Sequence, residues 1–231
     1  MTDRQAGHTA PGDTTAPGNA APGDSARGGA DRGGAAVGDA GLGGLVLGPD
    51  GRQRCPWGAA PEIYTAYHDS EWGRRIDGDD AVYERLCLEA FQSGLSWLTI
   101  LRKREAFRAG FDGFVIEQVA GYGPDDVARL LADAGIVRNR AKIEAAIANA
   151  RAALDLPDGL AKLLWSYAPE PRPRPAGLAD VPASTPESKA MSKDLKRRGF
   201  RFVGPTTAYA LMQATGMVDD HLAGCWVPPA R

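Results

Sequence analysis

The amino-acid sequence predicts an all-α fold for residues 51–231. Apolar side chains recur there at spacings of three and four residues, which is the period of helices packed against a core. Residues typical of helix ends, such as acidic pairs, Thr-Pro and glycine, stand on either side of these segments. The alternation typical of strands is nearly confined to Phe200–Val203, so we expect no sheet-based class.

The predicted helices follow one another along the chain. The first spans residues 61–68, the second begins at Asp79 and ends near residue 94, and the third begins at Ser96 and continues past residue 107. The fourth starts at Gly123–Pro124, before acidic residues that favour a helix N-terminus, and stops at residue 135. The fifth follows at once and runs to residue 154. After a proline-rich connection, the sixth spans residues 185–199 and the seventh 204–216.

The first 50 residues differ in composition from the rest. Gly, Ala, Pro and Asp dominate them, and the triplet Ala-Pro-Gly recurs between residues 10 and 24. Such a segment buries too little apolar surface to offset its ordering entropy. We therefore expect a disordered tail over residues 1–50 and one folded domain over residues 51–231. No apolar stretch follows a basic start and none approaches a membrane span, so we expect neither a signal peptide nor a membrane partner.

The net charge of the chain is small. It is −2 in total, and the three Arg and six Asp of residues 1–50 contribute −3, which leaves about +1 for the domain. A nearly neutral domain has no global signature of nucleic-acid binding, so DNA affinity must come from local patches. The chain has only three cysteines, which together with the missing export signal predicts a reducing cytoplasm. No feature implies an obligate protein partner, and we expect a monomer.

Four of the cysteines and histidines lie in two pairs at opposite ends of the predicted domain. Cys55 and His68 form the first pair, and His221 and Cys225 form the second. Two thiolates and two imidazoles are enough for a tetrahedral zinc site without an open position, which is typical of a structural site. A zinc ion there would tie the two ends of the domain together. The alternative is that the pairs are unrelated, because neither spacing is that of a familiar zinc finger.

Five short segments carry a resemblance to a known family. They read AYHDSEWG over residues 66–73, LEAFQSGLSW over 88–97, AGIVRNRAKI over 134–143, KRRGFRFVG over 196–204 and DHLAGC over 220–225. In this order they closely resemble the 3-methyladenine-DNA glycosylase I family, over essentially all of residues 51–231. The resemblance implies a helical bundle of the helix-hairpin-helix glycosylase superfamily, with one structural zinc ion on the two Cys/His pairs. It also implies a base-excision repair enzyme that hydrolyses the N-glycosidic bond of 3-methyladenine in double-stranded alkylated DNA.

Glu89 is the residue most strongly marked for chemistry. A carboxylate in an otherwise apolar helix is costly to bury unless a partner compensates its charge. Adenine methylated at N3 is positively charged, and a flipped base of that kind would be such a partner. The resemblance assigns base recognition to Glu89, a hydrogen bond to Tyr67 and stacking to Trp97. Other aromatic residues of that region are Trp57, Tyr64 and Trp72. For any single aromatic residue, ordinary core packing is the alternative.

Two basic segments are candidates for DNA contacts. Under the resemblance, residues 130–143 take the place of the hairpin, where Gly135 would expose backbone N–H groups to a phosphate. Arg138, Arg140 and Lys142 would add positive charge. The alternative is a plain helix C-cap at Gly135 beside a solvated basic face. The second segment, residues 189–201, carries three lysines and three arginines that could contact the DNA backbone.

The expected chemistry is monofunctional. Under the resemblance, no lysine stands where a lyase nucleophile is expected. The water-activating Asp of the wider superfamily follows the hairpin, whereas Asp125 precedes it and is interpreted as part of a helix start. A non-catalytic, zinc-stabilised DNA-damage binding protein is the alternative to an enzyme, because it needs the same zinc site and aromatic pocket. A zinc hydrolase is disfavoured, because four protein ligands leave the metal no position for water.

Overall fold

The computed structural model describes residues 44–229, so residues 1–43 of the tail predicted over residues 1–50 lie outside the described residues. Residues 44–50, which the prediction also placed in the tail, take a definite form. Strand β1 (Val46–Leu47) pairs antiparallel with β2 (Gln53–Arg54) in a two-stranded sheet. The reason is Leu45, which is 7% exposed and packs against an apolar cluster at the other end of the chain.

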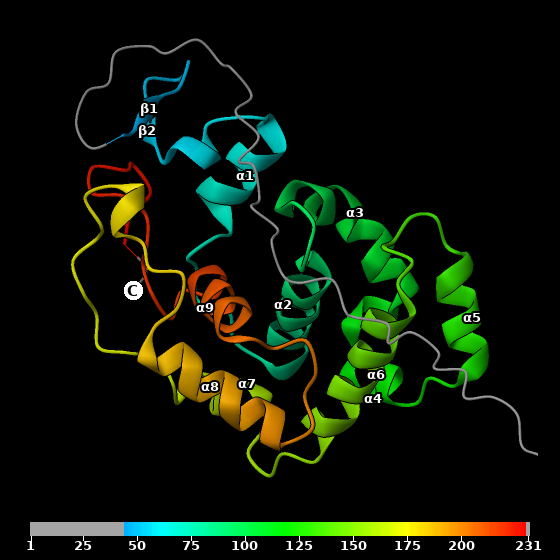
Figure 1. Ribbon diagram of the computed structural model, residues 1–231. Helices are drawn as coiled ribbons and strands as arrows, with labels where there is room; N and C mark the ends of the chain where they lie inside the picture. Colours follow the sequence, from blue (N-terminus) through cyan, green and yellow to red (C-terminus); the bar gives the residue numbers. More distant parts are fainter. Residues whose placement is uncertain (1–43, 230–231) are drawn as a thin grey trace, which may run out of the picture. The chain divides into compact units, whose positions relative to one another are not determined.

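The described residues are mostly helical, as the sequence predicts (Figure 1). The seven predicted helices correspond to α1, α2, α3, α5, α6, α8 and α9, while the short helices α4 and α7 were not predicted, and residues 200–203 form no strand. The helices are α1 Glu62–Ser70, α2 Asp79–Gln92, α3 Trp97–Gly110, α4 Ile116–Ala120, α5 Pro124–Ala132, α6 Arg140–Leu154, α7 Leu160–Trp165, α8 Pro186–Arg197 and α9 Pro205–Ala214. Three 3-10 turns join them: η1 Pro56–Gly58, η2 Asp112–Phe114 and η3 Leu178–Asp180.

The acidic pair at the start of α2 caps neighbouring helices. Asp79 accepts a hydrogen bond of 2.8 Å from the backbone N–H of Ala161, in the first turn of α7. Asp80 accepts one of 2.9 Å from the N–H of Ile116, the first residue of α4. Each carboxylate satisfies an N–H group that its helix leaves unpaired. The pair was predicted to begin α2, and it also holds in place the two helices that were not predicted.

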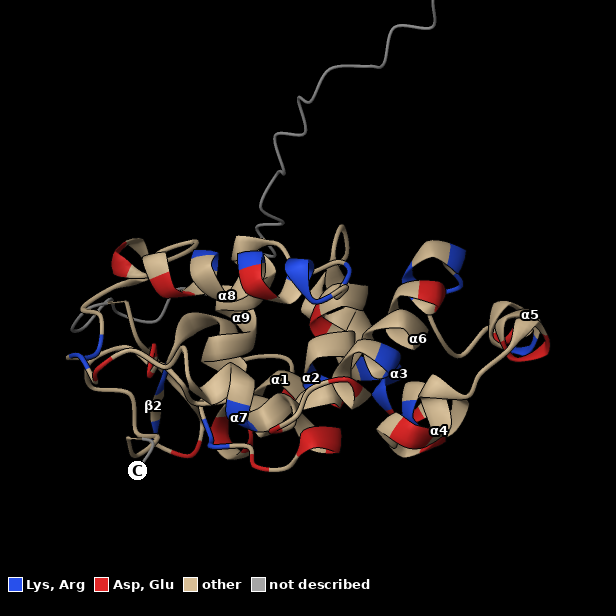
Figure 2. Cartoon of the chain, turned by 90° about the horizontal axis from the view of Figure 1, so that it is seen from below, with Lys and Arg blue, Asp and Glu red and all other residues tan. Residues whose placement is uncertain are grey.

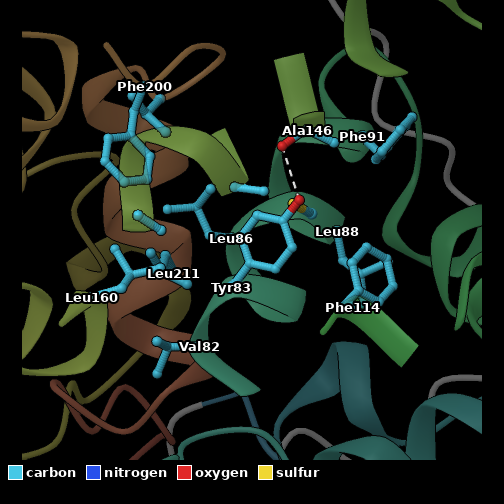
Figure 3. Close-up of a cluster of buried hydrophobic side chains, with 14 of the residues drawn as sticks. Val82, Tyr83, Leu86, Leu88, Phe91, Phe114, Ala146, Leu160, Phe200 and Leu211 are labelled. Carbon is cyan, nitrogen blue, oxygen red and sulfur yellow. Dashed lines mark hydrogen bonds between the residues drawn. The ribbon is translucent and has the colours of Figure 1, made fainter. Parts of the chain in front are cut away.

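Helix α2 runs through the main hydrophobic core. Figure 3 shows Tyr83 and Leu86 of α2 among apolar side chains that come from other helices and turns. The Tyr83 hydroxyl donates a hydrogen bond of 2.8 Å to the carbonyl oxygen of Ala146 in α6. Because α2 is buried along most of its length, a functional side chain in its last turn stands on a rigid element.

The two ends of the described chain meet. The backbone N–H of Trp226 donates a hydrogen bond of 2.9 Å to the carbonyl of Gln53, and the β1–β2 hairpin lies beside the C-terminal segment in Figure 1. Leu45 and Cys55 from the first end pack with Leu222 and Cys225 from the other. Among residues 44–229, no helix is both long and apolar enough to cross a membrane.

Candidate active site and metal centre

A cavity of about 270 Å³ lies where α1, α2, α3 and α9 meet. Five of the six predicted pocket residues contribute to its wall. Tyr64 does not: its ring meets the edge of Trp57 with centroids 5.9 Å apart, outside the lining. The residues that line the cavity are Trp57, Tyr67, Trp72, Glu89, Gln92, Trp97, Leu178, Val181, Ala210, Gln213 and Asp220.

Glu89 stands in the last turn of α2 and is 5% exposed. No side chain or backbone group in the described part of the chain donates a hydrogen bond to its carboxylate. Burial raises the pKa of Glu89 to about 7, and the positive charge of Arg85, one helical turn earlier, opposes that rise. A positively charged or hydrogen-bond-donating ligand in the cavity would stabilise the ionised form of this carboxyl group.

Tyr67 and Trp97 form the aromatic wall beside Glu89. Their ring centroids are 5.5 Å apart, and the indole N–H of Trp97 is buried without a partner in residues 44–229. The Tyr67 hydroxyl accepts a hydrogen bond of 2.7 Å from Arg85. A flat base placed against these rings would be stacked and would face the Glu89 carboxyl group.

The pocket also contains residues that sequence reasoning missed. Asp220 is buried and accepts hydrogen bonds from Tyr209 at 2.6 Å, Arg172 at 2.7 Å and Gln213 at 2.8 Å. The connection between α7 and α8, read only as a proline-rich surface segment, contributes Leu178 and Val181 to the wall. The position of Asp220 next to a predicted metal ligand was a usable signal, whereas nothing in the connection itself marked its role.

A second cavity of about 330 Å³ adjoins the first. It shares Glu89, Gln92 and Ala210 with the first cavity, so Glu89 borders both. Its remaining wall consists of the loop after α2 and the first turn of α9, whose N–H groups form the positive end of a helix dipole. Leu95, in that loop, is 41% exposed. Glu89 therefore stands between the first cavity and a second one beside the start of α9.

Three of the four predicted metal ligands converge. The ligand atoms of Cys55, His68 and Cys225 all lie within 4.8 Å of one another, and all three residues are buried. The Cys225 sulfur is 3.6 Å from Nε2 of His68. The hydrogen bond with Cys55 lowers the pKa of Cys225 to about 4, while the same contact and burial raise the pKa of Cys55. One proton therefore stays between the two sulfur atoms, on Cys55, and a metal cation in its place would stabilise both sulfurs as thiolates.

His221 lies beside this group rather than within it. Its ring centroid is 5.0 Å from that of His68, and its Nε2 atom is buried without a partner among residues 44–229. The other ring nitrogen of each histidine meets a carboxylate: Nδ1 of His68 is 2.8 Å from Asp69, and Nδ1 of His221 is 3.0 Å from Asp219. Carboxylates in this position orient histidine ligands of metal ions. The orphaned nitrogen and the two carboxylates fit a metal ion bound by all four residues.

Aromatic rings connect the metal centre to the cavity. The ring of Trp57 lies 5.1 Å from His68 and 4.9 Å from Trp72, and the ring of Trp72 lies 4.7 Å from His221. Both tryptophans also line the cavity of Glu89. Fixing the two histidines therefore fixes one wall of the pocket.

The predicted hairpin residues have other tasks in the structure. The Gly135 N–H donates a hydrogen bond of 2.7 Å to Asp133, and a Cβ atom on Gly135 would lie 2.8 Å from Cβ of Ala106, so close packing requires the glycine. Lys142 is buried, and its ammonium group donates hydrogen bonds to the carbonyls of Phe91 and Ser93. Its charge thus holds the loop after α2 and points away from solvent, contrary to the expected phosphate contact.

Among the residues predicted to contact DNA, exposed positive charge lies at the start of α6, along α8 and at Arg201. Arg138 and Arg140 are exposed at the start of α6. On α8 the exposed lysines are Lys189, Lys193 and Lys196, and Figure 2 shows Lys and Arg along this helix. The arginines at the end of α8 are both paired with Asp194, which reduces the charge they present.

Comparison with known proteins gives consistent matches. The model of the methyladenine glycosylase family matches residues 57–228. DNA-3-methyladenine glycosylase 1 of Escherichia coli (strain K12) is 45% identical over 184 residues, which cover 78% of this chain and 98% of that protein. DNA-3-methyladenine glycosylase of Haemophilus influenzae is 42% identical over 178 residues, 74% of this chain and 96% of that protein.

Solved structures resemble the fold. A crystal structure of 3-methyladenine DNA glycosylase I is similar with a TM-score of 0.74 at 45% identity, over 77% of this chain and 100% of that chain. A variant of 3-methyladenine DNA glycosylase I in complex with 3-methyladenine is similar with a TM-score of 0.73 at 34% identity, over 77% of this chain and 99% of that chain.

Proposed function

The chain belongs to the methyladenine glycosylase family, and we propose that its Glu89 cavity receives a 3-methyladenine base flipped out of alkylated DNA. The chain is a DNA-3-methyladenine glycosylase, a hydrolase of base-excision repair. The observation that carries the assignment of the site is one carboxyl group, buried and without a hydrogen-bond donor in residues 44–229, in an aromatic cavity. An adenine base with a positive charge and an exocyclic amine complements both features.

In this mechanism the pocket acts on a bond that is already weak. Trp97 and Tyr67 stack on or contact the base, and Glu89 accepts a hydrogen bond from its exocyclic amine. The bond between the sugar carbon and the base nitrogen breaks, and its electron pair neutralises the positive charge of the base. Water adds to the sugar carbon and loses a proton, which leaves an abasic site and a free base. Because no lysine lines the cavity, we propose that the reaction is monofunctional.

We propose that the metal centre holds one structural zinc ion. Cys55, His68, His221 and Cys225 would be its ligands, since two thiolates and two imidazoles are a common closed zinc set. The ion would stabilise the folded chain and the tryptophan wall, and it would take no part in bond breakage. The three described cysteines are free thiols, which suits a reducing cytoplasm.

DNA would approach the side where the second cavity reaches Glu89. Double-stranded DNA presents phosphates, which Arg138, Arg140 and the exposed lysines of α8 can contact. The helix pair α5–α6 stays our proposal for a helix-hairpin-helix element, with Gly135 serving the packing of its turn. We expect the protein to work on DNA as a monomer.

The experiment is a time course of free base and abasic sites from a methylated duplex. We expect 3-methyladenine and abasic sites to appear in equal amounts, without strand cleavage by the protein. Tight binding of the lesion without release of base would support the non-catalytic damage-binding alternative. Strand cleavage coupled to release would contradict the monofunctional mechanism.

A further inference from the structure

Arg85 is a buried cation placed directly behind the base pocket. The residue is 6% exposed and does not line the cavity. One guanidinium nitrogen donates the 2.7 Å hydrogen bond to the Tyr67 hydroxyl, and another lies 3.8 Å from Glu71. The guanidinium carbon is 5.3 Å from the Tyr67 ring centroid and 5.8 Å from that of Trp97. Arg85 therefore touches both aromatic residues of the proposed base site.

The contact with Arg85 sets the direction in which Tyr67 can hydrogen-bond. A guanidinium group only donates, so the Tyr67 oxygen is the acceptor and keeps its own proton. No acceptor for that proton is found among residues 44–229. Tyr67 lines the cavity, so its hydroxyl can donate to a ligand there. A base atom that meets Tyr67 must then be an acceptor, such as an unprotonated ring nitrogen.

Arg85 also faces Glu89 from one turn earlier on α2, the spacing at which side chains of a helix are neighbours. The other titratable groups in the cavities that Glu89 lines are Tyr67 from α1 and Asp220 after α9. Lys142 from α6 binds the carbonyl groups of Phe91 and Ser93, just after Glu89 in the chain. From α3 and α9 the cavity receives Trp97, Ala210 and Gln213, which do not titrate. Arg85 is thus the positive charge on α2 that favours the ionised form of Glu89.

The carboxylate of Glu71 offsets the cost of burying the Arg85 charge. Glu71 accepts two hydrogen bonds from Arg104 and lies within ion-pair distance of Arg85, so one carboxylate is shared by two guanidinium groups. These contacts hold Arg85 behind the pocket, so that its guanidinium group is not part of the cavity wall. A buried cation that is held in one place can polarise its neighbours without moving.

We propose that Arg85 is a positioning residue for base recognition, which holds the Tyr67 hydroxyl as a donor and the Glu89 carboxylate as an acceptor. The pocket then presents a donor beside an acceptor. That pair matches the edge of adenine on which an exocyclic amine lies next to a ring nitrogen acceptor. This inference rests on the proposed function and names how the same site selects its base.

The test compares Arg85→Met and Arg85→Lys with wild type. The control is Arg108→Met, which removes the partner of Glu84, the residue beside Arg85 on α2. The readout is kcat/KM for 3-methyladenine release across pH. Loss of a hydrogen bond from a charged group predicts a drop of roughly tenfold to a hundredfold for Arg85→Met. The acid limb should also move to higher pH, because Glu89 loses its cation. Arg85→Lys should restore the position of that limb.

Measuring the effect of Arg85→Met in a Tyr67→Phe variant distinguishes a positioning role of Arg85 from a general effect on folding. Arg85→Met should cost less there than in wild type, because part of its effect passes through the hydroxyl that Phe lacks. An unchanged pH profile and full additivity, in folded variants of an active enzyme, would overturn the inference and leave the proposed function intact. A wild type that releases no base would instead overturn the proposed function.

Discussion

Glu89 should make the protein less stable as pH rises, and Glu89→Gln should remove this dependence. Burial raises the pKa of Glu89 from 4.5 to about 7. A carboxyl group whose pKa is raised by folding binds more protons in the folded state, so its contribution to stability is fully present below pH 4.5 and is lost as pH rises through 7. A pKa difference of this size corresponds to about 3 kcal/mol in total, most of it between pH 5 and pH 8.

The assay is urea unfolding of the zinc-loaded wild type and Glu89→Gln at pH 5 and pH 8. Other carboxylates titrate equally in both proteins, so the difference between their free energies of unfolding isolates Glu89. We expect this difference to shift in favour of Glu89→Gln by about 2–3 kcal/mol between the two pH values. A difference that stays constant with pH would refute the raised pKa of the buried Glu89 carboxyl group, which the proposed base recognition requires.

Three further predictions concern the elements that hold the site. Cys225→Ser should abolish tight zinc binding and lower the melting temperature, which calorimetry with metal analysis would measure; an unchanged transition in metal-free protein would contradict the zinc site. Leu45→Ala should speed the transfer of zinc to a chelator, because Leu45 packs against the two cysteines. The control Leu47→Ala, at a position that is 67% exposed, should not change the rate. Equal transfer rates for the two variants would contradict the idea that the β1–β2 hairpin shields the metal site. Lys142→Met should lower the free energy of unfolding by about 1–3 kcal/mol, since two carbonyls lose their donor, while an effect no larger than that of the exposed control Arg140→Met would contradict its interior role.

The helices were largely predictable because their signals are local. Capping residues such as Ser96 and Thr185 accept hydrogen bonds from backbone N–H groups of their own helices, as their positions in the sequence suggest. Helices α4 and α7 are too short to show a period, and each starts at a carboxylate supplied by α2. Their existence depends on tertiary contacts that a pass along the sequence does not reveal.

The site residues likewise divide into those that a continuous sequence motif marks and those whose role depends on a partner distant in the sequence. Glu89 and Trp97 belong to one continuous motif, and both line the cavity. Lys142 resembles a surface cation in the sequence, yet its target is a pair of carbonyls in another helix and loop. Arg85 looks like one more charge on a helix, and its meaning appears only when α1 brings Tyr67 against it. Roles defined by a partner distant in sequence lie beyond single-sequence reasoning.

The most direct test is the release of 3-methyladenine from methylated DNA by wild type and Glu89→Gln, measured side by side with freed bases separated by chromatography. Both proteins should be folded and zinc-loaded, and wild type alone should release the base at an appreciable rate, because the amide lacks the acceptor charge of the carboxylate. Release by Glu89→Gln at the wild-type rate would contradict the proposed role of Glu89 in recognising the base.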